Sequence, residues 1–477
     1  MEVVSLAERF DVVIIGGGPG GYGAALYGAS AGLRIAVIEK NKVGGTCLHV
    51  GCIPAKELLE TASVYRHVAG AKEFGIAASQ PTIDFGVTQA RKQKVVDRLF
   101  KGLQGTLKSR EVTIYDGHGR LHADRRVTVS GAADSSGAAA DSAELTGDAV
   151  ILAPGSVPRT IPGFDIEGTL VMTSDEVLDI EEIPASVAVI GGGAVGCEFA
   201  SLFADLGSQV TILEALPKLL PGCDNDVTSA VNRAFKKRGI DVRTKVEVKG
   251  HTPNDKGGTT VELGDGSLEV DKVIVSVGRR PNTQDMGLEG TAVRLDDGGF
   301  LQVDPQCRTG EPRVWAIGDA IATPALAHVG FSEGIGAIKE ILDEPVVPVD
   351  YGSVPWCIYC HPEVAFAGHS EQSAKDAGFE VVTSTHRYGA NGRAMILGET
   401  DGLVKVIAEK GDDDTAGRIL GVHMVGPWVT EQLGQGYLAV NWEATAADVA
   451  HFIQPHPTLS ELFGESALSL TGRSLNA

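Results

Sequence analysis

The chain has 477 residues, of which 43% are hydrophobic and 22% are charged, a composition typical of a folded globular protein rather than a disordered one. Its formal net charge of −21 and the absence of a basic run argue against binding to nucleic acid or to an anionic membrane surface. At about 100–200 residues per domain, the length predicts three or four structural units.

The start of the chain carries no basic leader and no small-residue cleavage site, so we expect no signal peptide. The longest uncharged stretch, residues 12–33, is interrupted by eight glycines and Pro19, and we expect no membrane span. Seven cysteines without a signal favour a reducing compartment, which predicts a cytoplasmic protein.

Residues 11–40 predict a buried strand, a glycine turn, a small-residue helix and a second strand that ends in an acid. The segment reads DVVIIGGGPGGYGAALYGASAGLRIAVIEK. Residues 186–215, SVAVIGGGAVGCEFASLFADLGSQVTILEA, align with it without gaps at an offset of 186 − 11 = 175, with 10 of 30 positions identical. The chain therefore contains two copies of one strand–turn–helix–strand motif.

The glycines of both copies fit the G-x-G-x-x-G pattern of dinucleotide-binding turns. The first glycine permits the tight turn, the second lets a pyrophosphate approach the backbone, and the third lets helix and strand pack closely. The helix N-terminus then offers free N–H groups to the phosphates. The glycines are Gly16, Gly18 and Gly21 in the first copy and Gly191, Gly193 and Gly196 in the second. One such pattern is weak evidence, but two complete copies predict two bound dinucleotides.

Glu39 and Glu214 each lie 23 residues after the first glycine of their copy, where an acid accepts hydrogen bonds from a ribose diol. No arginine follows Glu214 closely. Because an acid repels a 2′-phosphate, the second site favours NAD over NADP.

Between the two copies, residues 44–60 read GGTCLHVGCIPAKELLE and hold two cysteines. Pro54 suits the first turn of a helix, and the cysteines can form a disulfide only if Cys47 precedes that regular helix. A thiolate at a helix N-terminus is stabilised by the dipole and is the reactive form, and Lys56 adds positive charge. On spacing alone, Cys47 and Cys52 fit two buried small apolar residues equally well.

Four further motifs follow along the chain: VGRRPN (277–282), AIGDA (316–320), LAHVGFSEG (326–334) and HPTLSE (456–461). Together with GGTCLHVGCIPAK (44–56) and the two glycine patterns, they make the chain resemble the flavin-dependent pyridine-nucleotide disulfide oxidoreductases over nearly its whole length. The resemblance is greatest to the members that oxidise dihydrolipoyl groups. It implies that electrons pass from these groups through a Cys47–Cys52 disulfide and FAD to NAD⁺.

The resemblance leaves two alternatives. One is an NAD(P)H-dependent reductase of another small-molecule disulfide, although such NADPH enzymes usually carry basic residues where this chain has Glu214. The other is a scaffold subunit or a flavoprotein without disulfide activity, against which intact Cys47, Cys52 and His456 argue.

The resemblance places FAD at the first glycine pattern and NAD at the second. The residues for which it implies cofactor contacts are Gly16, Gly18, Gly21, Glu39, Gly45, Thr46, Lys56, Gly155, Asp319, Ala327, Gly191, Gly193, Gly196, Glu214 and Gly278. Asp319 matches an acid on the flavin's ribityl or phosphate side, although an ordinary turn aspartate also fits AIGDA. Arg279 matches the family's GRxPN turn, and a solvated arginine is an equally good interpretation.

The same resemblance implies the catalytic residues. Cys47 and Cys52 form the redox disulfide, His456 is the base that takes a thiol proton near neutral pH, and Glu461 orients it. Lys56 and Glu198 match an ion pair near the flavin ring, whereas the sequence alone favours an ordinary lysine and glutamate on helix surfaces. No His/Cys spacing suggests zinc, and we expect no metal.

We predict an α/β fold with two Rossmann-like dinucleotide-binding domains and a C-terminal α+β interface domain. The predicted boundaries are 1–155 for the first part of the FAD-binding domain, 156–283 for the NAD-binding domain, 284–352 for the return to the FAD-binding part, and 353–477 for the interface domain. In the family, the segment that holds His456 reaches the disulfide of a partner subunit, so the resemblance implies a homodimer. It also implies a lipoyl-bearing acyltransferase or a glycine-cleavage carrier protein as partner.

The chain departs from the family pattern at a few positions, none of which removes a group that the reaction needs. They are His49, Ala55, Pro154 and Gln454, where the family usually has asparagine, serine, threonine and often histidine, respectively.

Cys357 and Cys360 resemble a redox C-x-x-C motif, but we expect a strand there, on which positions three apart face opposite sides. Residues 130–147, rich in small residues, predict an enlarged hairpin loop.

Overall fold

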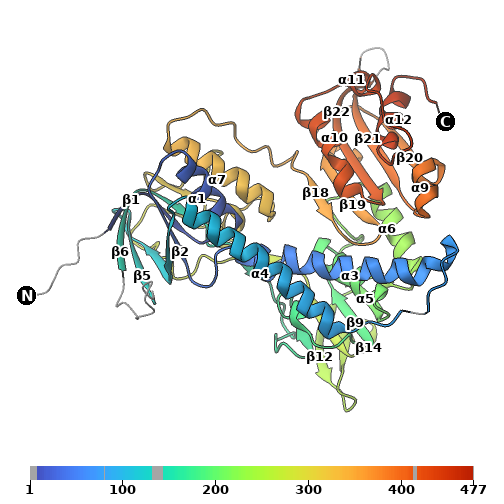
Figure 1. Cartoon of the computed structure of the whole chain (residues 1–477), viewed down its shortest axis with the longest axis horizontal. Helices are drawn as coiled ribbons and strands as arrows, with labels where there is room; N and C mark the ends of the chain where they lie inside the picture. The colour runs from blue at the N-terminus through green and yellow to red at the C-terminus, as the bar shows by residue number, and fades with distance from the viewer. Residues whose placement is uncertain (1–7, 80, 132–142, 412–415, 476–477) are drawn as a thin grey trace, which may run out of the picture. The chain divides into compact units, whose positions relative to one another are not determined.

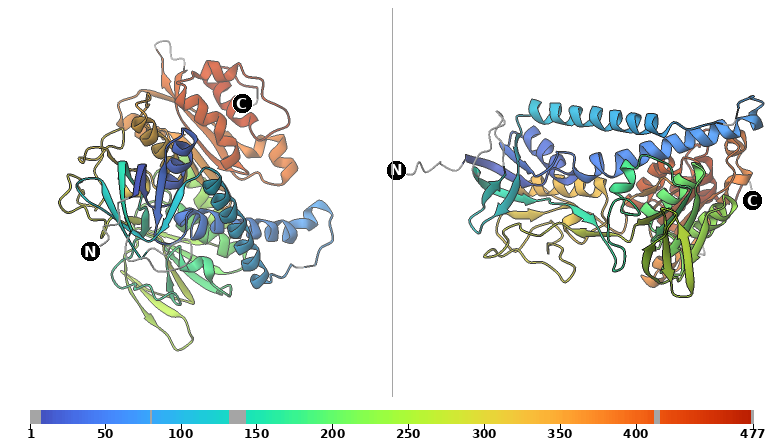
Figure 2. Two further views of the ribbon diagram at one scale, coloured as in Figure 1. Left: turned by 60° about the vertical axis from the view of Figure 1, so that its left-hand side comes forward. Right: turned by 90° about the horizontal axis from the view of Figure 1, so that it is seen from below.

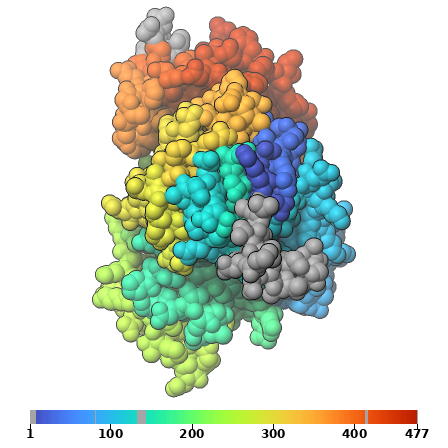
Figure 3. Space-filling view, turned by 90° about the vertical axis from the view of Figure 1, so that its left-hand side faces the viewer, coloured from blue at the N-terminus to red at the C-terminus, as the bar shows by residue number. Residues whose placement is uncertain are grey.

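The computed structural model describes residues 8–79, 81–131, 143–411 and 416–475 (Figure 1). It has two compact units, and each is assembled from separate stretches of chain. The first unit comprises Met1–Glu57, Gly86–Arg159 and Gly278–Tyr351, and the second comprises Leu58–Phe85, Thr160–Val277 and Gly352–Ala477. In the space-filling view, the blue, cyan and yellow surfaces of the first unit's three stretches adjoin one another (Figure 3). The finer division into four domain segments stays a prediction.

The first unit is built on a parallel sheet extended by an antiparallel hairpin. The strand order is β3-β2-β1-β6-β5-β4, with β17 paired to β6. Its parallel strands are β1 (Glu8–Ile15), β2 (Ile35–Glu39), β3 (Thr113–Asp116), β6 (Ala143–Leu152) and β17 (Val314–Ala316), and the hairpin strands are β4 (His118–Leu121) and β5 (Arg126–Ser130). All five residues of β2 are buried, as expected for a strand covered on both faces.

Helices α1 (Pro19–Ser30) and α7 (Ala327–Ile341) pack against each other in this unit through small residues (Figure 1). A Cβ atom added to Gly334 would lie 2.7 Å from the Gly20 carbonyl oxygen, so only glycine permits this approach. The other elements here are α2 (Gly45–His49), α4 (Phe85–Ser109), η3 (Gly318–Ala320), and the paired strands β7 (Ser156–Pro158) and β16 (Arg279–Pro281). Helix α3 (Cys52–Gly70) begins in the first unit, and its later part and η1 (Ala71–Phe74) belong to the second.

The second unit contains a second parallel sheet, of order β11-β10-β9-β15-β8. Its first four strands repeat the order β3-β2-β1-β6, and the internal repeat found in the sequence is thus confirmed as a structural repeat. The elements are β8 (Val171–Met172), β9 (Ser186–Ile190), β10 (Gln209–Glu214), β11 (Asp241–Thr244), β15 (Lys272–Val275), η2 (Glu176–Asp179), α5 (Ala194–Asp205) and α6 (Asn225–Lys237). A small antiparallel sheet joins β12 (Val248–Pro253), β13 (Thr259–Leu263) and β14 (Gly266–Val270).

The C-terminal part of the second unit is an antiparallel sheet of order β18-β19-β22-β21-β20 with helices on both faces (Figures 1 and 2). Helices α10, α11 and α12 share a core with Val404, Val406, Val422 and Met424, whereas α8 packs beside Ile407 on the other face. The bounds are β18 (Trp356–Ile358), β19 (Glu363–Gly368), β20 (Val381–Arg387), β21 (Leu403–Lys410), β22 (Ala416–Gly426), α8 (Glu371–Asp376), η4 (Tyr388–Ala390), α9 (Gly392–Leu397), α10 (Val429–Asn441), α11 (Ala446–Ala450) and α12 (Glu461–Leu470). The predicted α/β fold class with an α+β C-terminal part is confirmed.

The smaller sequence expectations have mixed outcomes. Strands β5 and β6 pair antiparallel around the expected loop, of which residues 132–142 lie outside the described residues. Strand β18 ends at Ile358, so the expectation that Cys360 lies on the same strand as Cys357 was wrong, and Cys360 is buried in the turn that follows. No helix in the described ranges combines the length and apolar character that crossing a membrane requires.

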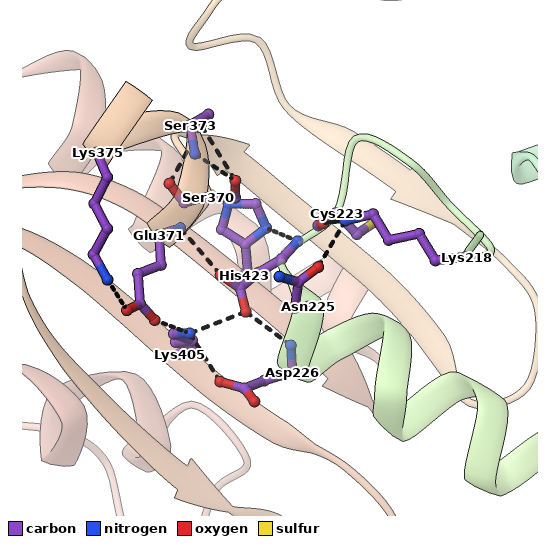
Figure 4. A network of polar contacts seen from close by, with 11 residues as sticks. Lys218, Cys223, Asn225, Asp226, Ser370, Glu371, Ser373, Lys375, Lys405 and His423 are labelled. Atoms are coloured by element: carbon purple, nitrogen blue, oxygen red, sulfur yellow. Dashed lines mark hydrogen bonds and ion pairs between the residues drawn. The ribbon is translucent and has the colours of Figure 1, made fainter. Parts of the chain in front are cut away.

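A buried polar network ties α6 to the C-terminal sheet (Figure 4). The Lys405 ammonium, 4% exposed, lies 3.0 Å from Asp224, 2.8 Å from Asp226 and 2.7 Å from Glu371. The Asp224 N–H donates to His423 Nδ1 at 3.3 Å. Since removing one member of a buried charge network leaves the others unpaired, this network fixes the start of α6 on strands β21 and β22.

We expect His423 to make the second unit sensitive to acid. Burial lowers the pKa of His423 from 6.5 to about 4, against the opposing effect of Asp224, while Lys405 and Lys218 lower it further. Between pH 6.5 and pH 4, His423 is therefore protonated in the unfolded chain but neutral in the folded chain. The free energy of unfolding that is present above pH 6.5 is lost as the pH falls toward 4. At 1.36 kcal/mol per pKa unit, the loss amounts to about 2–3 kcal/mol.

Urea unfolding at pH 7 and pH 4.5 measures this loss. A His423→Gln variant should lose less stability than the parent protein over this interval, because it removes the group that takes up the proton. Equal losses in the two proteins would contradict the assignment.

Candidate active site

The first glycine turn has the geometry that its sequence predicts. Gly16 has φ +108°, and a Cβ there would lie 2.0 Å from the Ala153 carbonyl oxygen. A Cβ on Gly21 would lie 1.9 Å from the Gly16 carbonyl oxygen, so the third glycine lets α1 begin against the end of β1. Gly18, the N-cap of α1, has no heavy atom within 4 Å of the position of an added Cβ, which leaves open space at the helix N-terminus.

The second turn repeats this geometry. Gly191 has φ +106°, and a Cβ on Gly196 would lie 2.0 Å from the Gly191 carbonyl oxygen. Gly193, the N-cap of α5, again has nothing within 4 Å of an added Cβ. Neither α1 nor α5 has a side-chain cap. Free N–H groups at an open helix N-terminus fit a pyrophosphate, and the chain offers this fit twice.

The two acids brace these turns. Glu39 Oε2 accepts a hydrogen bond from the Gly17 N–H at 2.7 Å, and its Oε1 accepts from the Asn41 N–H at 2.8 Å. Glu214 makes the same pair, with the Gly192 N–H at 2.5 Å and the Leu216 N–H at 2.6 Å. Sequence reasoning predicted that these two acids contact a ribose, but it missed their hydrogen bonds to the backbone of the turn.

The remaining sequence-predicted residues of the first unit lie in loops or at helix ends. Gly45 begins α2, and a Cβ on it would lie 2.7 Å from Gly18 Cα, so this segment runs against the first glycine turn. Thr46 follows in α2, and Ala327 begins α7. Gly155 (φ +72°) and Gly278 (φ +104°) both have open space around an added Cβ.

Asp319 lies in η3 and is held by two polar side chains. Its Oδ2 accepts from Ser156 Oγ at 2.6 Å and lies 3.7 Å from Arg279 Nε. Arg279 also donates through Nε to Ser156 Oγ at 2.6 Å and through Nη2 to the Ser156 carbonyl at 2.8 Å. Of the two interpretations of Arg279, the solvated side chain is therefore wrong, because Arg279 joins β16 to β7 and faces Asp319.

Sequence reasoning missed Glu333, which is 1% exposed in α7. Its Oε2 accepts from the Gly318 N–H at 2.6 Å, and its Oε1 accepts from Thr323 Oγ1 at 2.9 Å and Tyr351 Oη at 3.0 Å. Burial raises the pKa of the carboxyl, whereas these hydrogen bonds lower it. The residue sits among buried Val329, Gly330 and Ala337 on one helix face, and an acid within an apolar stripe was the available signal.

The Cys47 and Cys52 thiols lie next to each other. Cys52 is the first residue of α3, and Cys47 lies in the separate short helix α2, so Cys47 does precede the regular helix as predicted. Both cysteines are partly buried. A hydrogen bond to Cys52 is the largest cause that raises the pKa of the Cys47 thiol, burial adds to it, and Lys56 acts in the opposite direction.

A tyrosine that sequence reasoning did not single out lies near the thiol pair. Burial, with smaller effects from both thiols, raises the pKa of Tyr22 in α1 to about 12.

Lys56 belongs to the first unit and Glu198 to the second. Glu198, 6% exposed in α5, accepts from the Tyr359 N–H at 2.9 Å, which is not the surface position that sequence alone favoured. The expected Lys56–Glu198 pair stays a prediction.

His456 and Glu461 form the expected pair in the second unit. His456 Nδ1 lies 2.7 Å from Glu461 Oε1, and the Glu461 side chain is 22% exposed against 77% for His456. A carboxylate on one ring nitrogen fixes the tautomer and leaves Nε2 as the nitrogen for proton transfer. The imidazole is accessible from solvent.

Comparisons with known proteins agree with these features. Residues 10–334 match a family model described as pyridine nucleotide-disulphide oxidoreductase, and residues 354–467 match the dimerisation domain of the same family. The chain is 39% identical to a dihydrolipoyl dehydrogenase of Bacillus subtilis, over 99% of this chain and 100% of that protein. It is 38% identical to a dihydrolipoyl dehydrogenase of Thermus scotoductus, over 98% and 99%.

Two solved structures have the same fold. LpdA from Mycobacterium tuberculosis aligns with a TM-score of 0.89 at 26% identity, over 97% of this chain and 100% of that one. The HOCl-induced flavoprotein disulfide reductase RclA from Escherichia coli aligns with a TM-score of 0.84 at 26% identity, over 96% and 99%.

The two glycine positions of the second turn separate ligand binding from folding. Gly193 has φ −75° and open space for a methyl group, so we expect Gly193→Ala to fold normally but to obstruct the second dinucleotide. The KM for NAD(H) should rise about tenfold or more, which corresponds to about 1.4 kcal/mol. Gly196→Ala is the matched variant and should lower stability by about 1–3 kcal/mol through overpacking.

Steady-state kinetics and thermal unfolding of both variants check this prediction. An unchanged KM in a folded Gly193→Ala protein would contradict the assignment of the second turn.

Proposed function

The chain belongs to the pyridine nucleotide-disulphide oxidoreductase family, and we propose that it oxidises dihydrolipoyl groups to lipoyl groups with NAD⁺. It is an FAD-dependent, NAD(H)-linked disulfide oxidoreductase. The observation that carries the choice of substrate is the full-length similarity to dihydrolipoyl dehydrogenases in a chain whose Cys47 and Cys52 thiols are hydrogen-bonded to each other. In the overall reaction, a dithiol and NAD⁺ give a cyclic disulfide, NADH and a proton.

The first chemical step is thiol–disulfide exchange at the Cys47–Cys52 pair. One substrate sulfur bonds to Cys47 as the Cys47–Cys52 bond breaks, and Cys52 leaves as a thiolate. Its place at the start of α3 supports this role, because the helix dipole stabilises a thiolate there. The second substrate sulfur then attacks the first, the bond to Cys47 breaks, and Cys47 recovers its thiol.

His456 moves the protons of this exchange. Its Nε2 takes the proton of the attacking substrate thiol, since only the thiolate is a good nucleophile. The hydrogen bond of Nδ1 to Glu461, at 2.7 Å, orients the ring and stabilises the imidazolium that forms. This proton passes from Nε2 to Cys47 as the mixed disulfide breaks, and Nε2 takes the proton of the second substrate thiol in its place.

Residues of this chain would hold the two cofactors that the onward electron transfer requires. We assign the FAD pyrophosphate to the open turn at Gly18 and the flavin side to Asp319, which Ser156, Arg279 and Glu333 hold in place directly or through Gly318. NAD belongs to the turn at Gly193, with Glu214 as the acid for its ribose. When bound, FAD supplies a two-electron carrier between the cysteine pair and NAD⁺.

We assign the remaining partners on the same basis. A homodimer is supported by the match of residues 354–467 to a dimerisation domain and by the exposure of His456. The lipoyl group would be carried by an acyltransferase or a glycine-cleavage carrier protein. The odd number of seven cysteines argues against a scaffold of structural disulfides and supports a reducing compartment, and we propose the cytoplasm.

The deciding experiment measures turnover of the purified yellow protein with lipoamide and NAD(H), with NADPH and glutathione disulfide as controls. We expect fast turnover with lipoamide and NAD(H) only. Turnover of another disulfide without turnover of lipoamide would overturn the assigned substrate and would favour a sister reductase.

The role of the thiol pair is tested by Cys47→Ser. This variant should lose more than about 99% of lipoamide turnover, because no exchange partner remains, while NADH should still reduce a dye that accepts electrons directly from the flavin. Full lipoamide turnover in this variant would remove the disulfide from the mechanism.

A site shared between two subunits predicts complementation. When Cys47→Ser and His456→Gln chains are co-expressed, about half of the dimers are mixed, and each mixed dimer has one intact site. The mixture should recover about a quarter of the parental lipoamide turnover, although each variant alone is nearly inactive. If Cys47 and His456 act within one chain, no activity returns.

A further inference from the structure

The segment that carries His456 is exposed, and its position needs an anchor. Phe452 and Ile453, just before it, are 68% and 96% exposed. Local contacts close the segment on itself, since Thr458 Oγ1 donates to the Pro455 carbonyl at 2.7 Å and the Thr458 N–H donates to Glu461 Oε2 at 2.7 Å. Such local bonds set the shape of the segment but do not fix it on the domain.

Asn391 supplies a polar bond from outside the segment. Its Nδ2 donates to the Thr458 carbonyl oxygen at 3.0 Å across 67 residues of sequence. Asn391 is 5% exposed, and its Oδ1 accepts from the Ala394 N–H at 2.9 Å as the N-cap of α9. Its own N–H donates to the carbonyl of fully buried Tyr388, so the carboxamide starts from a fixed backbone.

Three hydrogen bonds link this carboxamide to the imidazole. Asn391 holds the Thr458 carbonyl, the Thr458 N–H holds one oxygen of Glu461, and the other oxygen of Glu461 holds His456 Nδ1. Apolar contacts also hold the segment, through buried Leu459 and through Gln454, which packs against Gly464. These apolar contacts hold the segment against the domain. The three hydrogen bonds, in contrast, fix the orientation of the Glu461 carboxylate, which in turn orients the imidazole ring.

We propose that Asn391 is a positioning residue for His456 in the oxidation of dihydrolipoyl groups. This inference rests on the proposed function. The reacting sulfur, its proton and Nε2 must align within a fraction of an ångström, and a misplacement of about 1 Å costs about 100-fold in rate. Asn391 therefore acts on the exchange step and not on the transfer of electrons between NADH and the flavin.

Two substitutions remove the Nδ2 donor and keep the helix cap. Asn391→Ser leaves a good N-cap, and Asn391→Asp keeps the cap but places a carboxylate oxygen against the Thr458 carbonyl. We expect kcat with lipoamide to fall about 10- to 100-fold, and further in the Asp variant than in the Ser variant. The KM for NAD⁺, NADH-dependent dye reduction and retention of FAD should stay at parental values.

A matched control separates positioning from a general loss of stability. Ser370 caps α8 on the same domain by accepting from the Ser373 N–H at 3.1 Å. Ser370→Ala should lower the thermal midpoint by about 2–4 °C, as expected for a lost cap, without changing lipoamide turnover. The three variants are compared by thermal unfolding and by both assays.

The outcomes distinguish this inference from the proposed function. Parental lipoamide turnover in both Asn391 variants would overturn the inference, and so would an equal fall of lipoamide and dye turnover. Failure of both variants to fold with FAD would also overturn it, because Asn391 would then hold the whole domain. If the parent protein itself lacks lipoamide turnover but reduces dye with NADH, the proposed function fails instead.

Discussion

The contact between a glycine and a carbonyl oxygen at the start of two helices is the constraint on which the rest of the structure depends. At Gly21 and again at Gly196, a side chain would lie about 2 Å from the carbonyl of the first glycine of the turn. Only because this side chain is absent can each helix begin directly against the end of its strand. That placement directs the helix N-terminus and its free N–H groups toward the open space at Gly18 and Gly193. The segment that holds Cys47 runs against the first of these openings through Gly45.

The same carboxylate arrangement then stiffens both turns. Glu39 and Glu214 each bond the N–H of the glycine that follows the first and a second N–H two residues after the acid. A charged acceptor makes these bonds stronger than a neutral one would. The turn thus keeps its shape without a ligand, and a dinucleotide pays less of the cost of ordering the loop.

Short-range patterns predicted the framework, because strand, turn and helix are encoded by residues a few positions apart. The repeat, the roles of the three glycines and the position of Cys47 before α3 follow from local spacing, whereas the His456–Glu461 pair was implied by the family resemblance. Contacts between distant segments were not predictable in this way. Ser156 and Arg279 around Asp319, Glu333 on the Gly318 N–H, and Asn391 on the Thr458 carbonyl each join residues that no local pattern relates.

Two interpretations failed for the same physical reason. Arginine is mostly exposed in proteins, and sequence alone cannot reveal a neighbour more than 100 residues away, so a solvated Arg279 was a fair expectation. The interpretation of Glu198 as a residue on the helix surface failed likewise, since its carboxylate accepts a hydrogen bond from the Tyr359 N–H of a distant segment. A buried charge must find such a partner, and the partner is chosen by the tertiary fold rather than by the neighbouring sequence.

The acids of this chain show how one residue type serves both framework and site. Glu39, Glu214, Glu198, Glu333 and Glu461 each accept a backbone N–H from a loop or turn, at 2.5–2.9 Å. An ionised carboxylate has about four acceptor positions and no donor. Having bonded one N–H group, it retains lone pairs for a second donor, as Glu333 does for Tyr351 Oη and Glu461 does for His456 Nδ1. A carboxamide of the same shape has only one oxygen and cannot accept on both sides. The use of glutamate rather than glutamine at Glu39, Glu214, Glu333 and Glu461 therefore follows from the need to fix a loop and to receive a second donor at once.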